Sequence, residues 1–233
     1  MVVSCIALVP AAGMGQRMDE KVPKQYQCIA GKPLLFYTLL ALSKVPEITQ
    51  LAVVLAPCDM HFDQFDWSAF KSLMVLRVGG RSRFQSVKLG IAALQQQGLI
   101  KPQDWLLVHD GVRCCIRPDQ VTYFIQTLKD DEVGGVMAIP VSDTLKKTNT
   151  ESRIIQTVEK SNLWLAQTPQ MFRAYLLMKA LKQEIEATDE ASAIEYLGYR
   201  PTLVRGATNN IKVTYSTDLA LATALLTFTH LHS

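Results

Sequence analysis

Basic side chains gather in short, loop-like segments of this sequence, and together they suggest chemistry on a polyanion. These residues are Arg17, Lys21, Lys24, Arg81, Arg83, Arg113, Arg117, Lys146, Lys147, Lys160 and Lys212. Several basic loops can converge on one anion, because fixed positive charges attract it. No serine or cysteine nucleophile motif accompanies His109, so we expect this histidine to be structural.

A loop rich in small residues is the first candidate for phosphate binding. Residues 10–17 read Pro-Ala-Ala-Gly-Met-Gly-Gln-Arg and follow an apolar run. Small side chains let backbone N–H groups approach a polyphosphate closely. The segment lacks the Gly-Lys-Ser/Thr of a Walker A loop and the third, helix-opening glycine of a dinucleotide fingerprint. An NAD(P)-dependent oxidoreductase therefore stays a distant alternative.

Two further segments carry polar groups at the ends of apolar runs. Residues 79–86, Gly-Gly-Arg-Ser-Arg-Phe-Gln-Ser, join backbone freedom and positive charge to a predicted helix start, which is typical of an anion or base site. In residues 109–113, His-Asp-Gly-Val-Arg, Asp110 offers oxygen ligands for Mg²⁺. Ligands of open α/β sheets bind outside the carboxyl ends of the strands, so we expect these loops to form one site.

The elements that must position these loops alternate between strands and helices. Continuous apolar runs predict strands buried on both faces at residues 4–9, 51–56, 74–78, 105–109 and 135–139. The segments between them predict helices at residues 34–43, 83–96 and 118–128. This alternation predicts an α/β fold with a doubly wound, mostly parallel sheet.

The pattern changes after residue 140. Residues 144–147 and 154–158 flank a polar turn and predict a β-hairpin, but neither flank alternates cleanly enough to bury a face on its own body. We therefore expect a β-arm, at about residues 141–163, that packs on another subunit. The remaining expected elements are a strand at 164–166, helices at 174–185 and 190–196, the latter with Asp189 as N-cap, a strand at 202–205 and a helix after Ser216.

Composition sets outer limits on the function. The 233 residues are 48% hydrophobic, which fits one globular domain with an appendage. A net charge of +3 is too small for a protein that coats nucleic acid or an acidic membrane. The 5 cysteines form no Cys-x-x-Cys pair, which indicates a reduced, cytoplasmic chain. We expect neither a signal peptide nor a membrane span.

Short motifs occur in one order along nearly the whole chain. They are Pro10-Ala11-Ala12-Gly13-x-Gly15-x-Arg17-Met18, Pro23-Lys24-Gln25-Tyr26, His109-Asp110-x-x-Arg113, Asp143-Thr144, Thr168-Pro169-Gln170, Thr188-Asp189-Glu190-Ala191 and Asn210-Ile211-Lys212-Val213-Thr214. In this order they closely resemble the 2-C-methyl-D-erythritol 4-phosphate cytidylyltransferase family. The resemblance implies a single nucleotidyltransferase domain over residues 1–233, a homodimer built through the β-arm, and cytidylyl transfer from CTP to methylerythritol phosphate with release of pyrophosphate.

The resemblance also implies roles for residues at matching positions. Catalytic roles fall on Arg17, Lys24, Lys160 and Lys212. CTP binding falls on Pro10, Ala11, Ala12, Gly13, Gly80, Arg83, Ser86, Asp110 and Lys212. The second substrate falls to Asp110, Arg113, Thr144, Lys160 and Thr168. Asp110 is also the candidate ligand for the Mg²⁺ that accompanies CTP.

Three departures from the family's usual residues bear on substrate fit. Gly111-Val112-Arg113-Cys114 stands where the family has Ala-Ala-Arg-Pro, and Lys160 stands where it often has arginine. Arg81 and Ser82 replace an aspartate and a glutamate, which makes that rim more basic. A cytidylyltransferase for another polyol phosphate, such as ribitol 5-phosphate, stays an alternative because the CTP half of its site would be the same.

Overall fold

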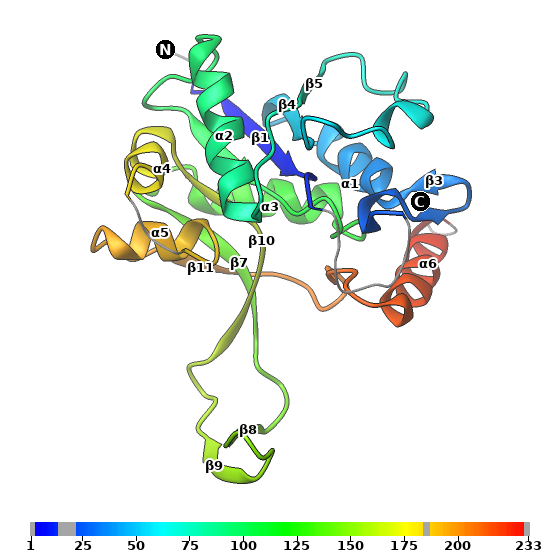
Figure 1. Cartoon of the computed structure of the whole chain (residues 1–233). Coiled ribbons are helices and arrows are strands. Elements are labelled where there is room, and N and C mark those ends of the chain that lie inside the picture. Colours follow the sequence, from blue (N-terminus) through cyan, green and yellow to red (C-terminus); the bar gives the residue numbers. More distant parts are fainter. Residues whose placement is uncertain (1–2, 14–21, 184–186, 231–233) are drawn as a thin grey trace.

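A seven-stranded sheet with the strand order β11-β7-β10-β6-β1-β4-β5 lies at the centre of the molecule (Figure 1). The computed structural model describes residues 3–13, 22–183 and 187–230. The strands are β1 (Cys5–Pro10), β4 (Ile48–Val54), β5 (Leu73–Leu76), β6 (Trp105–Val108), β7 (Gly134–Pro140), β10 (Trp164–Arg173) and β11 (Thr202–Arg205). The order shows that the chain crosses over the sheet repeatedly, as a doubly wound fold requires.

Most neighbouring strands run parallel, which confirms the predicted mostly parallel sheet. The exception is β10, which pairs antiparallel with both β6 and β7. Residues 164–166 alone were expected to form this strand, and that prediction was too short. Polar residues and Pro169 interrupt the apolar run in β10, so the sequence pattern conceals its second half.

Helices cover both faces of the sheet. Consecutive side chains of β1 point to opposite faces, and since nearly all of them are apolar, both faces must be buried. Ala7 and Val9 pack in one hydrophobic cluster with α1 and α3, whereas Ile6 and Leu8 pack in another with α2, α4 and α5. The helices are α1 (Leu34–Ser43), α2 (Arg83–Gln96), α3 (Pro118–Leu128), α4 (Ala174–Leu181), α5 (Glu190–Tyr196) and α6 (Ser216–His230). The continuous apolar sequence of β1 thus reflects burial on both faces.

The predicted bounds of α1, α2, α3 and α5 are confirmed, as is Asp189 as the N-cap of α5. The prediction for α4 was too long, because the helix ends at Leu181 rather than at residue 185. Residues 184 and 185, the last two of the predicted stretch, lie outside the described residues. The helix therefore ends where the apolar pattern ends, and polar residues follow it.

Smaller elements surround the sheet. Two short helices, η1 (Lys24–Tyr26) and η2 (Phe62–Gln64), and the ribbon of β2 (Cys28–Ile29) and β3 (Lys32–Pro33) were not predicted. The predicted hairpin exists as β8 (Leu145–Thr148) and β9 (Ile154–Val158), an antiparallel pair that projects away from the main sheet (Figure 1). Its use in dimerisation and the division of the chain into domains stay predictions.

The third hydrophobic cluster joins α6 to the rest of the molecule. Ala222 of α6 packs with Leu34 at the start of α1 and with Cys114 and Cys115, both of which are buried. Both cysteines are free thiols, and they serve as small side chains packed in the core. Within the described part of the chain, none of the helices has the length and apolar character needed to cross a bilayer.

Candidate active site

A pocket of about 770 Å³ opens where the carboxyl ends of β1, β5 and β6 meet. Ligand sites commonly have volumes of roughly 300–1,000 Å³. The residues that line it are Pro10, Ala11, Ala12, Gly13, Lys24, Gln25, Gly80, Arg81, Ser82, Arg83, Ser86, Asp110, Gly111, Val112, Lys212, Val213 and Thr214. The three loops singled out from the sequence thus contribute to one pocket, together with η1 and the segment before α6.

The loop after β1 is fixed from two sides. Its Ala11 N–H donates to the Val54 carbonyl at 2.8 Å, which continues the pairing of β1 with β4. The Gln25 amide donates to the carbonyls of Ala11 and Gly13 at 2.7 and 3.1 Å. Because Gln25 lies beside Lys24 in η1, the same contacts hold the lysine's backbone against the loop.

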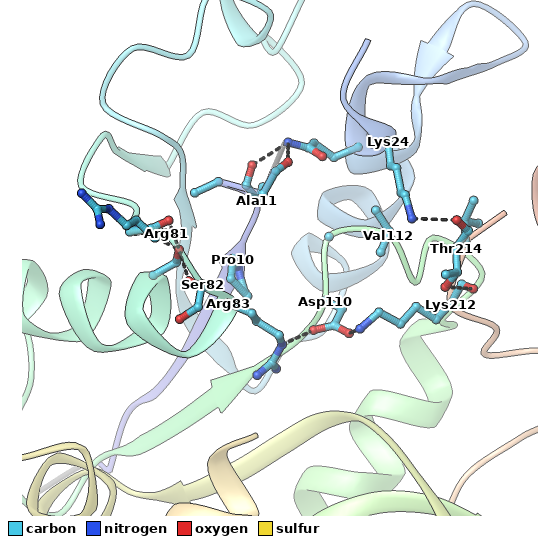
Figure 2. Close-up of a pocket in the computed structure, with 17 residues that line it drawn as sticks. Pro10, Ala11, Lys24, Arg81, Ser82, Arg83, Asp110, Val112, Lys212 and Thr214 are labelled. Atoms are coloured by element: carbon cyan, nitrogen blue, oxygen red, sulfur yellow. Dashed lines mark hydrogen bonds and ion pairs between the residues drawn. The ribbon is translucent and has the colours of Figure 1, made fainter. Parts of the chain in front are cut away.

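Lys24 and Lys212 approach the pocket from its other side. The Lys24 ammonium donates to the Thr214 carbonyl at 2.6 Å, and the Lys212 ammonium lies 2.9 Å from Asp110 Oδ2 (Figure 2). Lys212 and Thr214 belong to one short segment before α6. The two cations are therefore held near each other although 190 positions separate Lys24 from Thr214.

The turn before α2 depends on glycine because it touches the β1 loop. A methyl group added at Gly79 would lie 2.2 Å from Ala12 Cβ and 2.8 Å from the Leu55 carbonyl oxygen. The Gly80 N–H donates to Ser86 Oγ at 3.1 Å, and Ser82 caps α2 by accepting from the Gln85 N–H. The buried Ser86 hydroxyl thus braces the turn that borders the pocket.

Asp110 is held between cations at the end of β6. Its Oδ1 accepts from Arg83 Nε at 2.6 Å, and its Oδ2 faces Lys212 (Figure 2). Burial alone would raise the pKa of this carboxyl, but the charges of Arg83 and Lys212 outweigh burial and hold the pKa well below its usual range. The pocket therefore contains a carboxylate that is ionised near neutral pH.

Arg83 itself is held by a second carboxylate. Its two terminal nitrogens donate to Glu190 Oε1 and Oε2 at 2.8 and 2.9 Å. Burial disfavours the charge on Arg83, but Glu190 and Asp110 more than compensate and raise its pKa. Since both oxygens of Glu190 accept hydrogen bonds from the guanidinium, this carboxylate is ionised, although burial raises its pKa.

His109 is buried and supports the backbone at Asp110. The Asp110 N–H donates to Thr168 Oγ1 at 3.0 Å. His109 Nε2 lies 3.3 Å from the Arg113 carbonyl oxygen, which can only accept, so Nε2 carries the proton of the neutral ring. Nδ1 therefore accepts from the Thr168 hydroxyl, also at 3.0 Å. Burial lowers the pKa of His109 to about 4, so the ring is neutral near pH 7. This supports the expectation of a structural histidine.

Arg113 approaches Asp110 at Oδ2, whereas Arg83 contacts Oδ1. Its Nε is 3.8 Å from Asp110 Oδ2, and one of its terminal nitrogens donates to the Asn210 carbonyl at 2.7 Å. The Arg113 Nε is buried and has no hydrogen-bond acceptor among the described residues. Burial lowers the pKa of this guanidinium, and Asp110 partly offsets the effect. Arg113 thus retains donor capacity beside the pocket.

The structure gathers most, but not all, of the residues predicted for the site. The residues that line the pocket as predicted are Pro10, Ala11, Ala12, Gly13, Lys24, Gly80, Arg83, Ser86, Asp110 and Lys212. Arg113 and Thr168 contact Asp110 but do not line the pocket. Thr144 and Lys160 are on the projecting hairpin segment and do not line this pocket, and the Lys160 ammonium donates to the Ser142 carbonyl. Arg17 lies outside the described residues.

Asp110 also fits the expected role of a magnesium ligand. It is the only acid among the described residues that line the pocket, and it is ionised. No cluster of three or more histidine, cysteine or acidic side chains suited to a metal was found among the described residues. Mg²⁺ is commonly bound by one or two carboxylates together with substrate phosphates, so a single carboxylate suits an ion that arrives with a nucleotide.

The fold and the cation-lined pocket together define an α/β nucleotidyltransferase. The family model described as 2-C-methyl-D-erythritol 4-phosphate cytidylyltransferase (IspD) matches residues 5–228 of the chain. The chain therefore belongs to this family. The match to a transferase family leaves the alternative of an NAD(P)-dependent oxidoreductase without support.

Individual relatives agree with the family match. The 2-C-methyl-D-erythritol 4-phosphate cytidylyltransferase of Laribacter hongkongensis is 50% identical over 224 residues, with 95% of this chain and 96% of that protein covered. The protein of the same name from Chromobacterium violaceum is 49% identical, with 95% and 97% covered. A crystal structure of 4-diphosphocytidyl-2C-methyl-D-erythritol synthase superimposes with a TM-score of 0.87 at 38% identity and covers 97% of this chain and 100% of that chain.

Two residues of the site region received no role from sequence reasoning. Gln25 connects η1 to the β1 loop, and Glu190 holds Arg83 from behind the pocket. Both residues belong to short motifs that carry the family resemblance, but their chemistry alone gave no signal. An amide and a carboxylate next to a helix start are common on protein surfaces. Only the contacts in the folded chain show that both are buried.

Proposed function

We propose that the protein transfers the cytidylyl group of CTP to the phosphate of 2-C-methyl-D-erythritol 4-phosphate. The products are 4-diphosphocytidyl-2-C-methyl-D-erythritol and pyrophosphate, and the reaction belongs to isoprenoid precursor biosynthesis. Family membership over residues 5–228 supports this activity. The structural observation that carries it is the pocket in which the β1 loop, Lys24, Lys212 and Asp110 converge.

The residues of the pocket suit a reaction between two anions. The attacking group is a phosphate oxygen, which is already largely ionised near neutral pH because the second pKa of such a group is about 6. It needs no general base, which agrees with the neutral, buried His109. It does need relief from charge repulsion as it approaches the α-phosphorus of CTP, and the cations Lys24 and Lys212 suit that role.

CTP and the second substrate occupy different parts of the proposed site. We place the triphosphate and the cytosine against the β1 loop and the turn at Gly80, because both line the pocket and Gly13 and Gly80 have no side chain to shield their backbone. Arg113 and Thr168 contact Asp110 but do not line the pocket, and we assign them to the second substrate on the family resemblance. We assign the catalytic role of Arg17 from the family resemblance alone.

Mg²⁺ bound by Asp110 and the triphosphate completes the proposed site. When bound, the ion neutralises charge on the triphosphate and on the departing pyrophosphate. Asp110 would hold it, while Lys212 and Arg83 keep the carboxylate ionised. The protein's own contribution is to orient this carboxylate toward the pocket.

A homodimer would bring Thr144 and Lys160 to a pocket. The hairpin exposes large apolar side chains, with Ile154 and Ile155 at 64% and 59% exposure. Clustered exposed apolar side chains are typical of protein interfaces. We propose that the hairpin of one chain packs on a second chain and carries Lys160 into the second chain's site.

We also propose that the protein is located in the cytoplasm, and cell fractionation would test this.

Pyrophosphate release with a panel of substrates tests the proposal. The purified protein is incubated with CTP, UTP, ATP or GTP, and with methylerythritol phosphate, ribitol 5-phosphate or no acceptor. We expect rapid release only with CTP and methylerythritol phosphate, because we place the base against the Gly79–Gly80 backbone, where the second ring of a purine would be crowded. Preferred release with ribitol 5-phosphate would favour the alternative cytidylyltransferase, and equal rates with purine nucleotides would contradict the assigned base site.

A further inference from the structure

Glu190 is a charged residue that the protein buries completely without placing it in the pocket. Its exposure is 0%, and it is the first residue of α5, directly after the N-cap Asp189. Burying an ionised carboxylate is costly unless other groups compensate its charge. Neither the pocket lining nor the roles assigned above account for this residue.

The compensating group is Arg83, and the geometry fixes its orientation. Glu190 accepts from both terminal nitrogens of Arg83, at 2.8 and 2.9 Å, so the contact is bidentate. The remaining nitrogen, Nε, donates to Asp110 at 2.6 Å. A planar guanidinium held at three nitrogens cannot rotate without breaking hydrogen bonds.

The contacts continue from Arg83 to the pocket. Charges alternate along Glu190, Arg83, Asp110 and Lys212, from a fully buried carboxylate to an ammonium whose side chain is 46% exposed. Each inner group contacts a group of opposite charge on either side. A change at Glu190 therefore reaches Asp110 through Arg83, although Glu190 lies 107 positions from Arg83 in the sequence.

The start of α5 is itself fastened to the sheet. The Gln170 side chain of β10 donates to Asp189 Oδ2 at 2.8 Å and accepts from the Ala191 N–H at 2.9 Å. Asp189 and Ser192 form a reciprocal capping box in the same turn. These contacts lie on both sides of Glu190, so its carboxylate is presented to Arg83 from a rigid position.

We propose that Glu190 is a positioning residue for the transfer reaction, acting through Arg83 to hold Asp110 in its working orientation. By occupying both terminal nitrogens of Arg83, it limits the contact with Asp110 to Nε. Asp110 Oδ2 is then left for Lys212 and for groups that enter the pocket. This inference rests on the proposed cytidylyl transfer.

Removal of the Glu190 charge leads to a definite kinetic change. The terminal N–H groups of Arg83 lose their acceptors, and its charge is no longer balanced. The guanidinium can then turn both terminal nitrogens onto Asp110 or onto the triphosphate of CTP. Either contact keeps CTP bound but misplaces Asp110, so kcat falls while the KM for CTP does not rise.

The test compares Glu190→Gln with Glu190→Asp and with the control Ser192→Ala. The control loosens the same helical turn but leaves the Glu190 charge in place. Thermal unfolding curves identify a temperature at which all the variants are folded, and kcat and KM are measured at that temperature. We expect Glu190→Gln to lower kcat about 10–100-fold with an unchanged or lower KM for CTP, Glu190→Asp to recover part of the rate, and Ser192→Ala to retain it.

A double variant separates positioning from other effects. Arg83→Gln combined with Glu190→Gln removes both charges, so neither member of the pair is left as an unpaired buried charge. The double variant can therefore be measured even where Glu190→Gln alone does not fold. If Glu190 acts through Arg83, this double variant has the same kcat as Arg83→Gln alone. Losses that multiply, a wild-type kcat in folded Glu190→Gln, or an equal loss in Ser192→Ala would each overturn the inference. Absence of cytidylyl transfer by the wild-type protein would instead refute the proposed function.

Discussion

His109 and Asp110 are neighbours in the chain, yet the structure gives their side chains opposite electrostatic environments. Asp110 faces two cations, which keep its pKa far below the usual range against the effect of burial. His109 lies in the core, where burial lowers its pKa to about 4. One residue therefore supplies charge to the pocket, and the other supplies a neutral hydrogen-bond acceptor that holds Thr168 and the Asp110 backbone.

Lys24→Ala should remove catalysis and leave the fold nearly intact. The ammonium contacts the Thr214 carbonyl at the rim of the pocket, and the Lys24 side chain is only partly buried. Loss of one preorganised charge stabiliser commonly costs about 10²–10³ in rate. We expect a loss of that size in kcat, with a melting temperature close to that of Lys88→Ala, a control at an exposed lysine of α2 outside the pocket. A near-normal rate for Lys24→Ala would contradict its assigned role, and Arg17→Ala is expected to behave in the same way.

His109 should make the stability of the protein depend on pH in the mildly acidic range. Its pKa is lowered from 6.5 to about 4 in the folded protein. Between these values the unfolded chain binds the proton more readily, so stability is lost as the pH falls from 7 to 5, by about 2 kcal/mol from this residue. Asp110, with its lowered pKa, contributes only at a more acidic pH, where its unfolded form begins to take up a proton.

Urea unfolding of the wild-type protein and of His109→Asn at both pH values measures this contribution. Asparagine can still accept a hydrogen bond from Thr168, and it does not titrate. Glu190, whose pKa burial raises, acts in the opposite direction but is present in both proteins, so it cancels in the comparison. We expect a smaller pH dependence in the variant. Equal slopes for the two proteins would show that His109 does not titrate as described.

The turn before α2 and the loop after β1 form one rigid unit because glycine lets them touch. Gly79→Ala should separate them, since the new methyl would lie 2.2 Å from Ala12 Cβ. We expect a loss of about 1–3 kcal/mol in unfolding free energy and a higher KM for CTP. Adding Ala12→Gly removes one of the clashing groups and should restore part of both. Full stability of Gly79→Ala, or no recovery in the double variant, would contradict this packing.

Local sequence signals were sufficient to predict much of this framework. Residues 83–96 form α2 with the predicted bounds, and Gly80 and Asp110 come to the pocket because they follow parallel strands. The second half of β10 escaped prediction because polar residues interrupt its apolar run. The contact of Glu190 with Arg83 escaped it because their meeting depends on how α5 packs, which no local pattern records.

The hairpin of β8 and β9 bears on the assembly of the whole molecule. It projects from the sheet (Figure 1). Lys160, which follows β9 directly, does not line the pocket of its own chain. If each hairpin serves a second chain, then every site contains Lys24 from one chain and Lys160 from the other. Two defective chains can in that case form one intact site between them.

Mixing Lys24→Ala with Lys160→Ala chains tests this sharing. In an isologous mixed dimer, one site carries both lesions and the other carries neither. Random reassociation makes roughly half of the dimers mixed and about a quarter of all sites intact. We expect activity well above the mean of the two parent variants. Activity at that mean, with mixed dimers confirmed by native mass spectrometry, would show that Lys160 does not act across an interface.

The origin of the bridging oxygen in the product tests most directly whether the acceptor phosphate attacks the α-phosphorus of CTP. Methylerythritol phosphate with ¹⁸O in its phosphate is incubated with unlabelled CTP, and the product is examined by ³¹P NMR. If the phosphate oxygen attacks the α-phosphorus of CTP, that phosphorus acquires one bridging ¹⁸O and shows its isotope shift, while the released pyrophosphate contains no ¹⁸O. An α-phosphorus without the shift, or ¹⁸O in the pyrophosphate, would contradict the proposed reaction.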